Sequence, residues 1–399
     1  MHIERRLKHT RRWFWVITTF IIVLAMLLLF YYRDYYKAEP NGIPVPIDQS
    51  LAAKRLPGKD AIKVAIAVSQ NIYPATFADN KPGAVILVPK DDWMAAVLAT
   101  EIIHFPINAP ILYIDNNNIP RETLDEIKRL DPEGLFLDGN IKVILLTEPD
   151  GSIERQLKEE KLKFRVLSAE TPEKLASLLD DYKAMFHVDH DDEVIIMPKD
   201  PTYAVIATSW VAHMGHSLFY VGDDGLSASL RNSLAKRPQD AFIYVLGDEK
   251  TIPPEVTEEL AVYGHVQRIP GGDPFEMSTG FAAYLDFGPN FGWWIRRTTR
   301  QFGWAVGEAG HNFTFINPDF PLYVPPAAAL SHKGKHGPIL LVNQDTVTAS
   351  VSRYLRSVQP TFLSSQEQLF NHGWIIGDNN AISSSVQAEV DRLLQVKLR

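Results

Sequence analysis

The sequence predicts an α/β protein of three tandem Rossmann-like repeats with parallel sheets, preceded by one N-terminal transmembrane helix. Three observations lead to this prediction. Short, nearly continuous apolar runs alternate with helical stretches, and strands of that kind are buried on both faces of a parallel sheet. Stretches of sequence return more than a hundred residues later. An uncharged segment, residues 13–32, is long enough to cross a bilayer as a helix.

The N-terminal segment has the pattern of a signal anchor. Aromatic residues such as Trp13 and Tyr32 stand at both ends of the span, where amphipathic rings favour the membrane interface. Five basic residues in 1–12 precede it, so the positive-inside rule predicts a cytoplasmic N-terminus and an extracellular remainder. The exit sequence lacks the small residues of a cleavage site, which favours an uncleaved anchor over a signal peptide. The bilayer is therefore an expected partner.

Composition limits the remaining partners. The chain has no cysteine, which excludes thiol catalysis and thiolate metal sites. Residues 33–399 contain 35 Lys+Arg against 47 Asp+Glu, a formal net charge of −12. Such a surface repels polyanions on average, so nucleic acid is not an expected partner and any anion site must be local.

Residues 33–60 contain several prolines among polar residues and are predicted to be an extended spacer. The first repeat unit is predicted at 61–187, with strands at 64–68, 85–88, 111–114 and 143–146 and helices at 92–104 and 121–130. The second is predicted at 188–287, with strands at 194–197, 218–221 and 242–246 and helices at 203–214 and 227–234. The third is predicted at 288–399, with strands at 339–342 and 374–376 and a helix at 348–355.

The repeats are visible in the sequence itself. Residues 224–230 return at 345–351, and residues 245–248 return at 375–378. A period near 110 residues is too long for a solenoid unit and indicates a small domain used three times. This organisation favours a binding array over an enzyme, whose catalytic site is usually built once.

The end of the second unit resembles a known family. The matching positions follow the pattern Arg-Ile-Ser-Gly-x-Asp-Arg-Tyr-x-Thr-Ala, which joins modules of the cell wall-binding repeat 2 family of Gram-positive surface proteins. These positions are Arg268, Ile269, Gly271, Asp273, Phe275 and Thr279. Residues 109–112, 337–341 and 374–386 resemble further segments of that family, and the likeness covers residues 62–398. It implies three α/β modules about a pseudo-threefold axis and non-covalent binding of an anionic cell-wall polymer, such as a teichoic-acid-like polymer. The chain departs from the family at Asp248 and Asp378, where the family has a second glycine.

Candidate polymer-binding residues concentrate between the second and third units. Two tryptophans and two arginines recur at helical spacing, and aromatic platforms beside arginine suit a charged glycan. A loop with two lysines between two histidines is also strongly cationic. The predicted polymer-binding residues are Arg268, Trp293, Arg296, Arg297, Arg300, Trp304, Lys333 and Lys335. Each of these signals has a structural alternative: an ion pair of Arg268 with Asp273, packing of the tryptophans between units, and a solvated lysine loop.

No catalytic or cofactor motif is present: the chain has no nucleophile elbow, P-loop, His-Glu-x-x-His or nucleotide fingerprint. We therefore expect no catalytic residue, cofactor or metal. Lys90 and Lys199, each followed by an aspartate at a helix start, are interpreted as solvated beside a cap. His187 and His190 lie at a unit boundary and are interpreted as a solvated linker.

The sequence thus predicts a membrane-anchored, extracellular cell wall-binding protein of a bacterium. Two alternatives are a docking scaffold for other envelope proteins and a wall-glycan-processing enzyme that uses Asp248 or Asp378 as a carboxylate.

Overall fold

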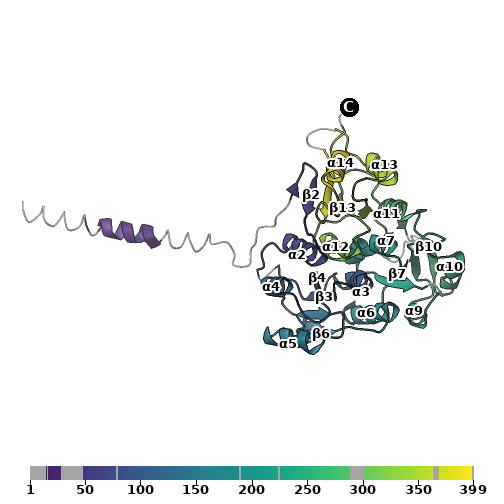
Figure 1. Cartoon of the computed structure of the whole chain (residues 1–399), viewed down its shortest axis with the longest axis horizontal. Coiled ribbons are helices and arrows are strands. Elements are labelled where there is room, and N and C mark those ends of the chain that lie inside the picture. Colours follow the sequence, from purple (N-terminus) through teal and green to yellow (C-terminus); the bar gives the residue numbers. More distant parts are fainter. Residues whose placement is uncertain are drawn as a thin grey trace, which may run out of the picture. The chain divides into compact units, whose positions relative to one another are not determined.

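The structure is a computed structural model that describes residues 15, 17–27, 48–77, 80–187, 190–222, 225–287, 301–362 and 368–397 (Figure 1). It separates into two compact units, Met1–Ile43 and Pro44–Arg399. In the first unit, residues 17–27 are helical. None of the helices within the described ranges has both the length and the apolar content that spanning a bilayer requires. Part of the predicted anchor, residues 13, 14, 16 and 28–32, lies outside the described residues, as does the predicted cytoplasmic segment 1–12.

Three sheets, each with four parallel strands, form the second unit, which confirms the predicted α/β fold with tandem repeats. The first sheet has the order β4-β3-β5-β6: Ile111–Ile114, Val85–Pro89, Val143–Leu145 and Phe164–Val166. The second has the order β8-β7-β9-β10: Ser217–Val221, Glu193–Pro198, Phe242–Val245 and His265–Arg268. The third has the order β14-β13-β15-β2: Ile339–Leu341, Asn312–Ile316, His372–Ile376 and Ala53–Leu56. Two short antiparallel pairings add β1 (Asp48–Gln49) to β2 and join β11 (Asp286–Phe287) to β12 (Gln301–Phe302).

Burial on both faces extends from the central strand β3 to the edge strands β4 and β8. Every residue of β3, β4 and β8 is buried, because helices cover both sides of each sheet. Continuous runs such as Val85–Pro89 leave no polar face to expose. The edge strands β6 and β10 alternate instead between half-buried and exposed residues.

Each sheet belongs to a module that begins with a helix. We define module 1 as residues 61–166, module 2 as residues 172–268, and module 3 as residues 274–394 together with residues 48–56. The leading helices are α2 (Ala61–Ile72), α6 (Pro172–His187) and α11 (Pro274–Ala283). They pack on the second strand of their own module's sheet, namely β4, β8 and β14. The further helices within the modules are α4 (Arg121–Leu130), α5 (Gly151–Glu159), α9 (Ala228–Leu234), α10 (Pro254–Leu260), α13 (Ala349–Ser357) and α14 (Ser384–Leu394), with the short η2 (Phe136–Asp138).

The helices that follow the first strand of each sheet connect the modules. These central helices are α3 (Trp93–Leu98) with η1 (Ala99–Ile102), α7 (Pro201–Ala204) with η3 (Val205–Ala207) and α8 (Thr208–Met214), and η4 (Pro321–Tyr323) with α12 (Val324–His332). Helix α12 contacts both α8 and η1, and α8 contacts η1. Each leading helix also contacts the central helix of another module: α6 contacts α3, α11 contacts α7, and α2 contacts α12. The contacts are therefore cyclic, as expected for three modules about a pseudo-threefold axis.

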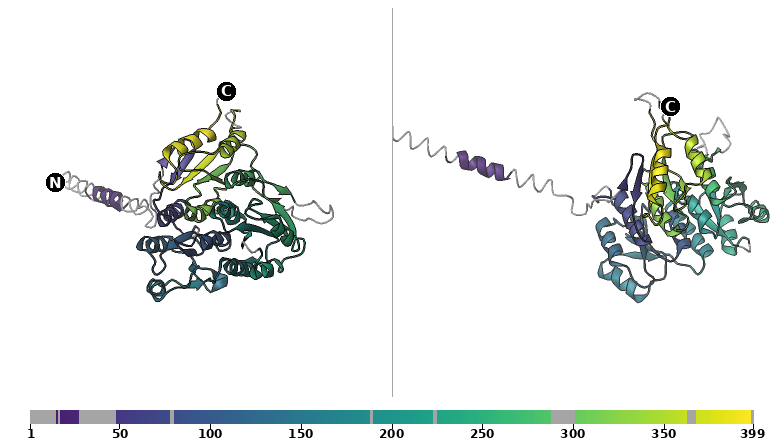
Figure 2. Two further views of the ribbon diagram at one scale, coloured as in Figure 1. Left: turned by 45° about the vertical axis from the view of Figure 1, so that its right-hand side comes forward. Right: turned by 45° about the horizontal axis from the view of Figure 1, so that its top comes forward.

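The prediction of an extended spacer over 33–60 is wrong for its last part. Residues 53–56 form β2, which pairs in parallel with β15 and supplies the fourth strand of module 3. In Figures 1 and 2 this N-terminal strand, coloured purple, lies beside the yellow C-terminal elements. The strand predicted at 64–68 is instead part of α2, which Asp60 caps by accepting a hydrogen bond from the Lys63 N–H. A short apolar run alone does not distinguish a strand from a buried helix, and here the N-cap Asp60 favours the helix.

The module boundaries also differ from the predicted units. Residues 172–187, placed in the predicted first unit, form helix α6, which packs on β8 and α9 of module 2. Residues 274–283, placed in the predicted second unit, form helix α11, which packs on β14 and α13 of module 3. Each boundary between modules therefore lies between the last strand of one module and the leading helix of the next.

Candidate functional site

Arg268 lies at the joint between modules 2 and 3, where both terminal guanidinium nitrogens bind main-chain oxygens. Nη1 donates to the carbonyl of Gly247, and Nη2 donates to the carbonyl of Ile252 at 2.7 Å. Burial lowers the pKa of this guanidinium below its usual range. Asp273 does not pair with Arg268 in this arrangement, because its carboxylate caps α11 by accepting from the Glu276 N–H. Arg268 thus holds the loop after β9, a structural role.

A second copy of this joint was missed in the sequence. Residues 55–60 repeat the order Arg, apolar residue, Pro, Gly, any residue, Asp that is found at 268–273. Arg55 is 2 % exposed and its Nη1 donates to the carbonyls of Gly377 and Asp378 at 2.9 and 3.1 Å. Its strand pairs with β15 as the strand of Arg268 pairs with β9. The order of residues at 55–60 could have predicted this second joint from the sequence. It was not recognised because the whole segment was predicted to be a spacer.

Four predicted polymer-binding residues cannot be placed. Trp293, Arg296, Arg297 and Arg300 lie outside the described residues, so their role stays a prediction. Trp304, in contrast, is described and lines a pocket at the boundary between modules 2 and 3, and its role in polymer binding stays a prediction.

A pocket of about 340 Å³ opens at this boundary. Module 2 contributes the end of α8, and module 3 contributes the segments around β12 and after α12. The lining residues are Trp210, His213, Met214, Gln301, Gly303, Trp304, Val306, His311, His336 and Gly337. Two tryptophans and three histidines make half of the lining aromatic, and aromatic side chains with a few polar groups are common in pockets that bind small ligands.

The aromatic rings of the pocket pack on one another. The centroids of Trp210 and Trp304 lie 5.2 Å apart in an edge-on arrangement, with the planes at 74°. His213 stacks on Trp304 at 5.8 Å, and the ring of His336 lies 4.3 Å from that of His213. The indole N–H groups of Trp210 and Trp304 are buried and have no hydrogen-bond acceptor in the described part of the chain. Buried tryptophans usually find such a partner, and these two donors beside the pocket lack one.

Two histidines of this region, His213 and His332, are uncharged at neutral pH because their pKa values are lowered. Burial, with smaller contributions from His336 and His104, lowers the pKa of His213 to about 4. Burial likewise lowers the pKa of His332 to about 4. Three histidines occupy equivalent positions in the modules. Each follows a matching residue in the first strand of its module by the same number of residues: His104 follows Leu87, His213 follows Ile196, and His332 follows Phe315. The three modules thus bring one histidine each to the ends of their central helices.

Lys333 and Lys335 are half-buried rather than fully solvated. The Nζ of Lys333 lies 4.9 Å from the ring centroid of Tyr73, and the Nζ of Lys335 lies 5.4 Å from that of Trp374. Burial lowers the pKa of both lysines. Of this cationic loop, His336 lines the pocket, whereas the two lysines contact aromatic rings of α2's C-terminal end and of β15.

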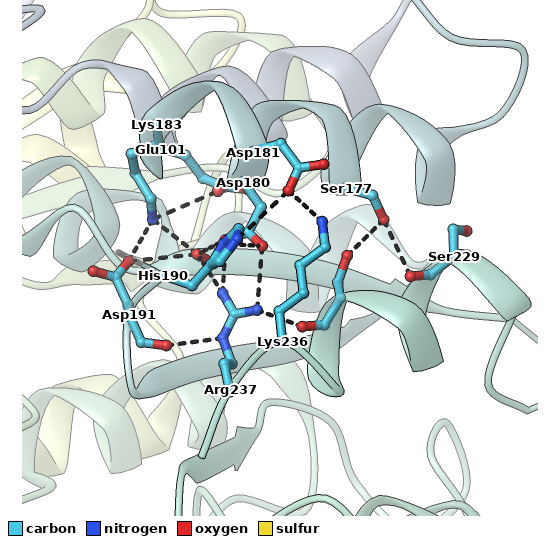
Figure 3. A network of polar contacts seen from close by, with 12 residues as sticks. Glu101, Ser177, Asp180, Asp181, Lys183, His190, Asp191, Ser229, Lys236 and Arg237 are labelled. Carbon is cyan, nitrogen blue, oxygen red and sulfur yellow. Dashed lines mark hydrogen bonds and ion pairs between the residues drawn. The ribbon is translucent and has the colours of Figure 1, made fainter. Parts of the chain in front are cut away.

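His190 is part of a network of polar contacts rather than a solvated linker (Figure 3). Its Nδ1 lies 3.0 Å from the carboxylate of Asp180, and its Nε2 lies 3.6 Å from that of Asp181. These three side chains bring possible metal ligands within 4.8 Å of one another. Arg237 already binds Asp180 at 2.6 Å, however, and Lys236 binds Asp181. A cation is thus already paired with each carboxylate, and the network ties α6 to the start of the second sheet.

The remaining charged candidates also have structural partners. Lys90 pairs with Asp115 at 2.7 Å, and Lys199 pairs with Glu173. Asp248 accepts from the N–H groups of Lys250 and Thr251.

Asp378 has the equivalent position in module 3 and accepts from the N–H of Asn380. Both aspartates that suggested a catalytic carboxylate thus stabilise the turns that follow β9 and β15.

Comparison with solved structures finds the same fold in two cell wall proteins. The chain superposes on Cwp8 from Clostridium difficile with a TM-score of 0.65 and 16 % identity, covering 87 % of this chain and 52 % of that one. It superposes on Cwp6 from Clostridium difficile with a TM-score of 0.64 and 16 % identity, covering 90 % of this chain and 51 % of that one. The chain therefore spans about half the length of these proteins, and the likeness shows the fold alone. No family model matches the chain, and no curated protein does.

Proposed function

We propose that this protein is a cell-envelope protein that binds an anionic cell-wall polymer non-covalently through its three modules, as members of the cell wall-binding repeat 2 family do. The observation that carries the proposal is the aromatic pocket between modules 2 and 3. The fold shared with two cell wall proteins supports it. Residues 13–32 would hold the protein in the membrane, so that it connects membrane and wall.

The chemistry of the pocket fits a glycan. Sugar rings present C–H groups on one face, which pack on indoles, and hydroxyls at the edge, which accept hydrogen bonds. Trp210 and Trp304 line the pocket with aromatic rings, and their buried N–H groups, which have no acceptor among the described residues, could donate to a ligand after a small rearrangement of the rings. Exposed Gln301 and His336 add polar groups at the opening. The predicted arginines Arg296, Arg297 and Arg300 precede Gln301 in the chain and would supply the positive charge that the pocket itself lacks.

A sedimentation assay tests the proposal. The full chain in mild detergent is mixed with purified Gram-positive cell walls and with walls stripped of secondary polymer. We expect recovery in the pellet with intact walls and loss of recovery with stripped walls. Equal recovery with both, or recovery with neither, contradicts the proposal.

Pocket variants locate the binding. Trp304→Phe keeps an aromatic ring and removes the N–H donor, and we expect it to weaken wall retention about five- to tenfold, as one lost hydrogen bond does. Gln301→Ala should act in the same direction. Gln267→Ala, an exposed glutamine on β10, is the matched control and should bind like the parent.

The triple change of Arg296, Arg297 and Arg300 to Ala tests the charge. It should abolish retention, and retention of the parent should fall as salt is raised, because salt screens the attraction. If the triple variant pellets like the parent at every salt concentration, the arginines do not bind polymer.

Carbonate extraction of cells that express the full chain tests the anchor. An integral segment at 13–32 keeps the protein in the membrane pellet at high pH, whereas release into the supernatant contradicts membrane anchoring.

A further inference from the structure

Lys54 and Lys335 come from distant parts of the sequence and meet at one indole ring. Lys54 lies on β2, at the start of the described fold, and Lys335 lies in the loop after α12. The Nζ atoms lie 5.9 and 5.4 Å from the ring centroid of Trp374. Lys54 and Trp374 are direct partners across β2 and β15, so their side chains leave the same face of the sheet.

Neither ammonium group contacts a carboxylate within the described ranges, although both side chains are half-buried. Buried Lys183, by comparison, has carboxylate partners: it pairs with Asp191 and lies 3.9 Å from Glu101. Burial, and then the charge of Lys54, lowers the pKa of Lys335. Two ammonium groups beside one indole ring repel each other when they are partly desolvated, so negative charge near that ring would be stabilised.

The surroundings strengthen such an attraction. Trp374 is 7 % exposed, and its buried indole N–H has no acceptor among the residues that the structure describes. An apolar wall of this kind lowers the local dielectric constant, which increases the force between a cation and an anion. Lys333, on the same loop, adds a third positive charge over Tyr73.

We infer that Lys54, Lys335 and Trp374 form an anion-binding site for a phosphate-type group. Ammonium groups bind phosphate as compact point charges, and two of them match its spread negative charge. The source of the group is either free phosphate or a phosphodiester in a polymer. This site is separate from the aromatic pocket and does not depend on the wall-binding proposal.

Site-resolved acylation of lysines tests the inference. The full chain in mild detergent is treated with a limiting amine-acylating reagent, with inorganic phosphate or with sodium chloride of equal ionic strength, and modification is read by peptide mass spectrometry. We expect phosphate to slow the acylation of Lys54 and Lys335. Exposed Lys59, close in sequence, is the internal control and should react at one rate in both salts. Equal rates at Lys54 and Lys335 in the two salts overturn the inference.

Variants make the test independent of the reagent. Lys335→Gln should weaken phosphate binding, measured by calorimetry on the full chain, about tenfold. Lys59→Gln should leave it unchanged, and parent-like binding by Lys335→Gln overturns the site.

A simple phosphodiester that protects as well as phosphate identifies a polymer group as the ligand, and protection by phosphate alone identifies the free ion. Because the probe is a small anion, failure here leaves the wall-sedimentation result unaffected.

Discussion

Removing the imidazole of His216 is expected to make the stability of the protein less sensitive to acid. His216 is 8 % exposed, and neither ring nitrogen has a hydrogen-bond partner in the described structure. Its ring stacks on Trp210 at 6.1 Å and lies 5.7 Å from that of Phe302. Burial lowers the pKa of His216 to about 4, with Asp191 opposing and Lys183, His104 and His213 adding smaller effects.

The sign follows from the protons bound. Between pH 6.5 and pH 4 the unfolded chain protonates this histidine and the folded chain does not, so the free energy of unfolding falls as the pH falls. Above pH 6.5 His216 is neutral in both the folded and the unfolded chain, so none of this stability is lost there. With the ordinary value of 6.5 and a folded value of about 4, the loss is about 2 kcal/mol at pH 5 and about 3 kcal/mol well below pH 4.

Urea unfolding of the full chain in mild detergent at pH 7.5 and at pH 5 measures this loss. His216→Leu keeps a side chain of similar volume and removes the titrating ring, so the difference between the two pH values should shrink by about 2 kcal/mol. His372→Leu, at an exposed position on β15, is the matched control and should keep the full difference. If His216→Leu loses as much stability at pH 5 as the parent, the burial of a neutral imidazole is not the cause.

Three further predictions concern the joints of the modules. Gly58→Ala should destabilise the fold by about 1–3 kcal/mol, because the new Cβ would lie 2.6 Å from the backbone nitrogen of Val64, whereas Gly151→Ala meets nothing within 4 Å and should be neutral in thermal unfolding. Arg55→Gln should cost about 2–4 kcal/mol, since it leaves the buried carbonyls of Gly377 and Asp378 without their donor; a change below 0.5 kcal/mol in urea unfolding would contradict this role. Deletion of residues 48–56 should open module 3 at β15, seen as faster amide exchange in β15 while β3 and β7 stay protected, and unchanged protection of β15 would refute it.

Much of the fold followed from local pattern. The continuous apolar runs at 85–88 and 194–197 were predicted to be doubly buried parallel strands, and the structure confirms both. A similar run at 64–68 forms a helix, so the apolar run alone does not decide the element. Trp304 was also expected at the boundary between the second and third units, where it lines the pocket. These features depend on residues close together in the chain, whose periodicity and composition are visible in the sequence.

Other features arise only from contacts between distant segments. Ala53–Leu56 contains two charged residues and has no strand pattern of its own, and its hydrogen bonds to β15 make it the last strand of module 3. The pocket combines the end of α8 with segments about ninety and more than a hundred residues later. Lys54 and Lys335 meet at Trp374 for the same reason. The sequence by itself determined most of the buried strands, such as 85–88 and 194–197, and that a module is used three times. The tertiary structure decided which strand completes which sheet and which side chains share a site, because long-range hydrogen bonding and burial leave no periodic signal in the chain.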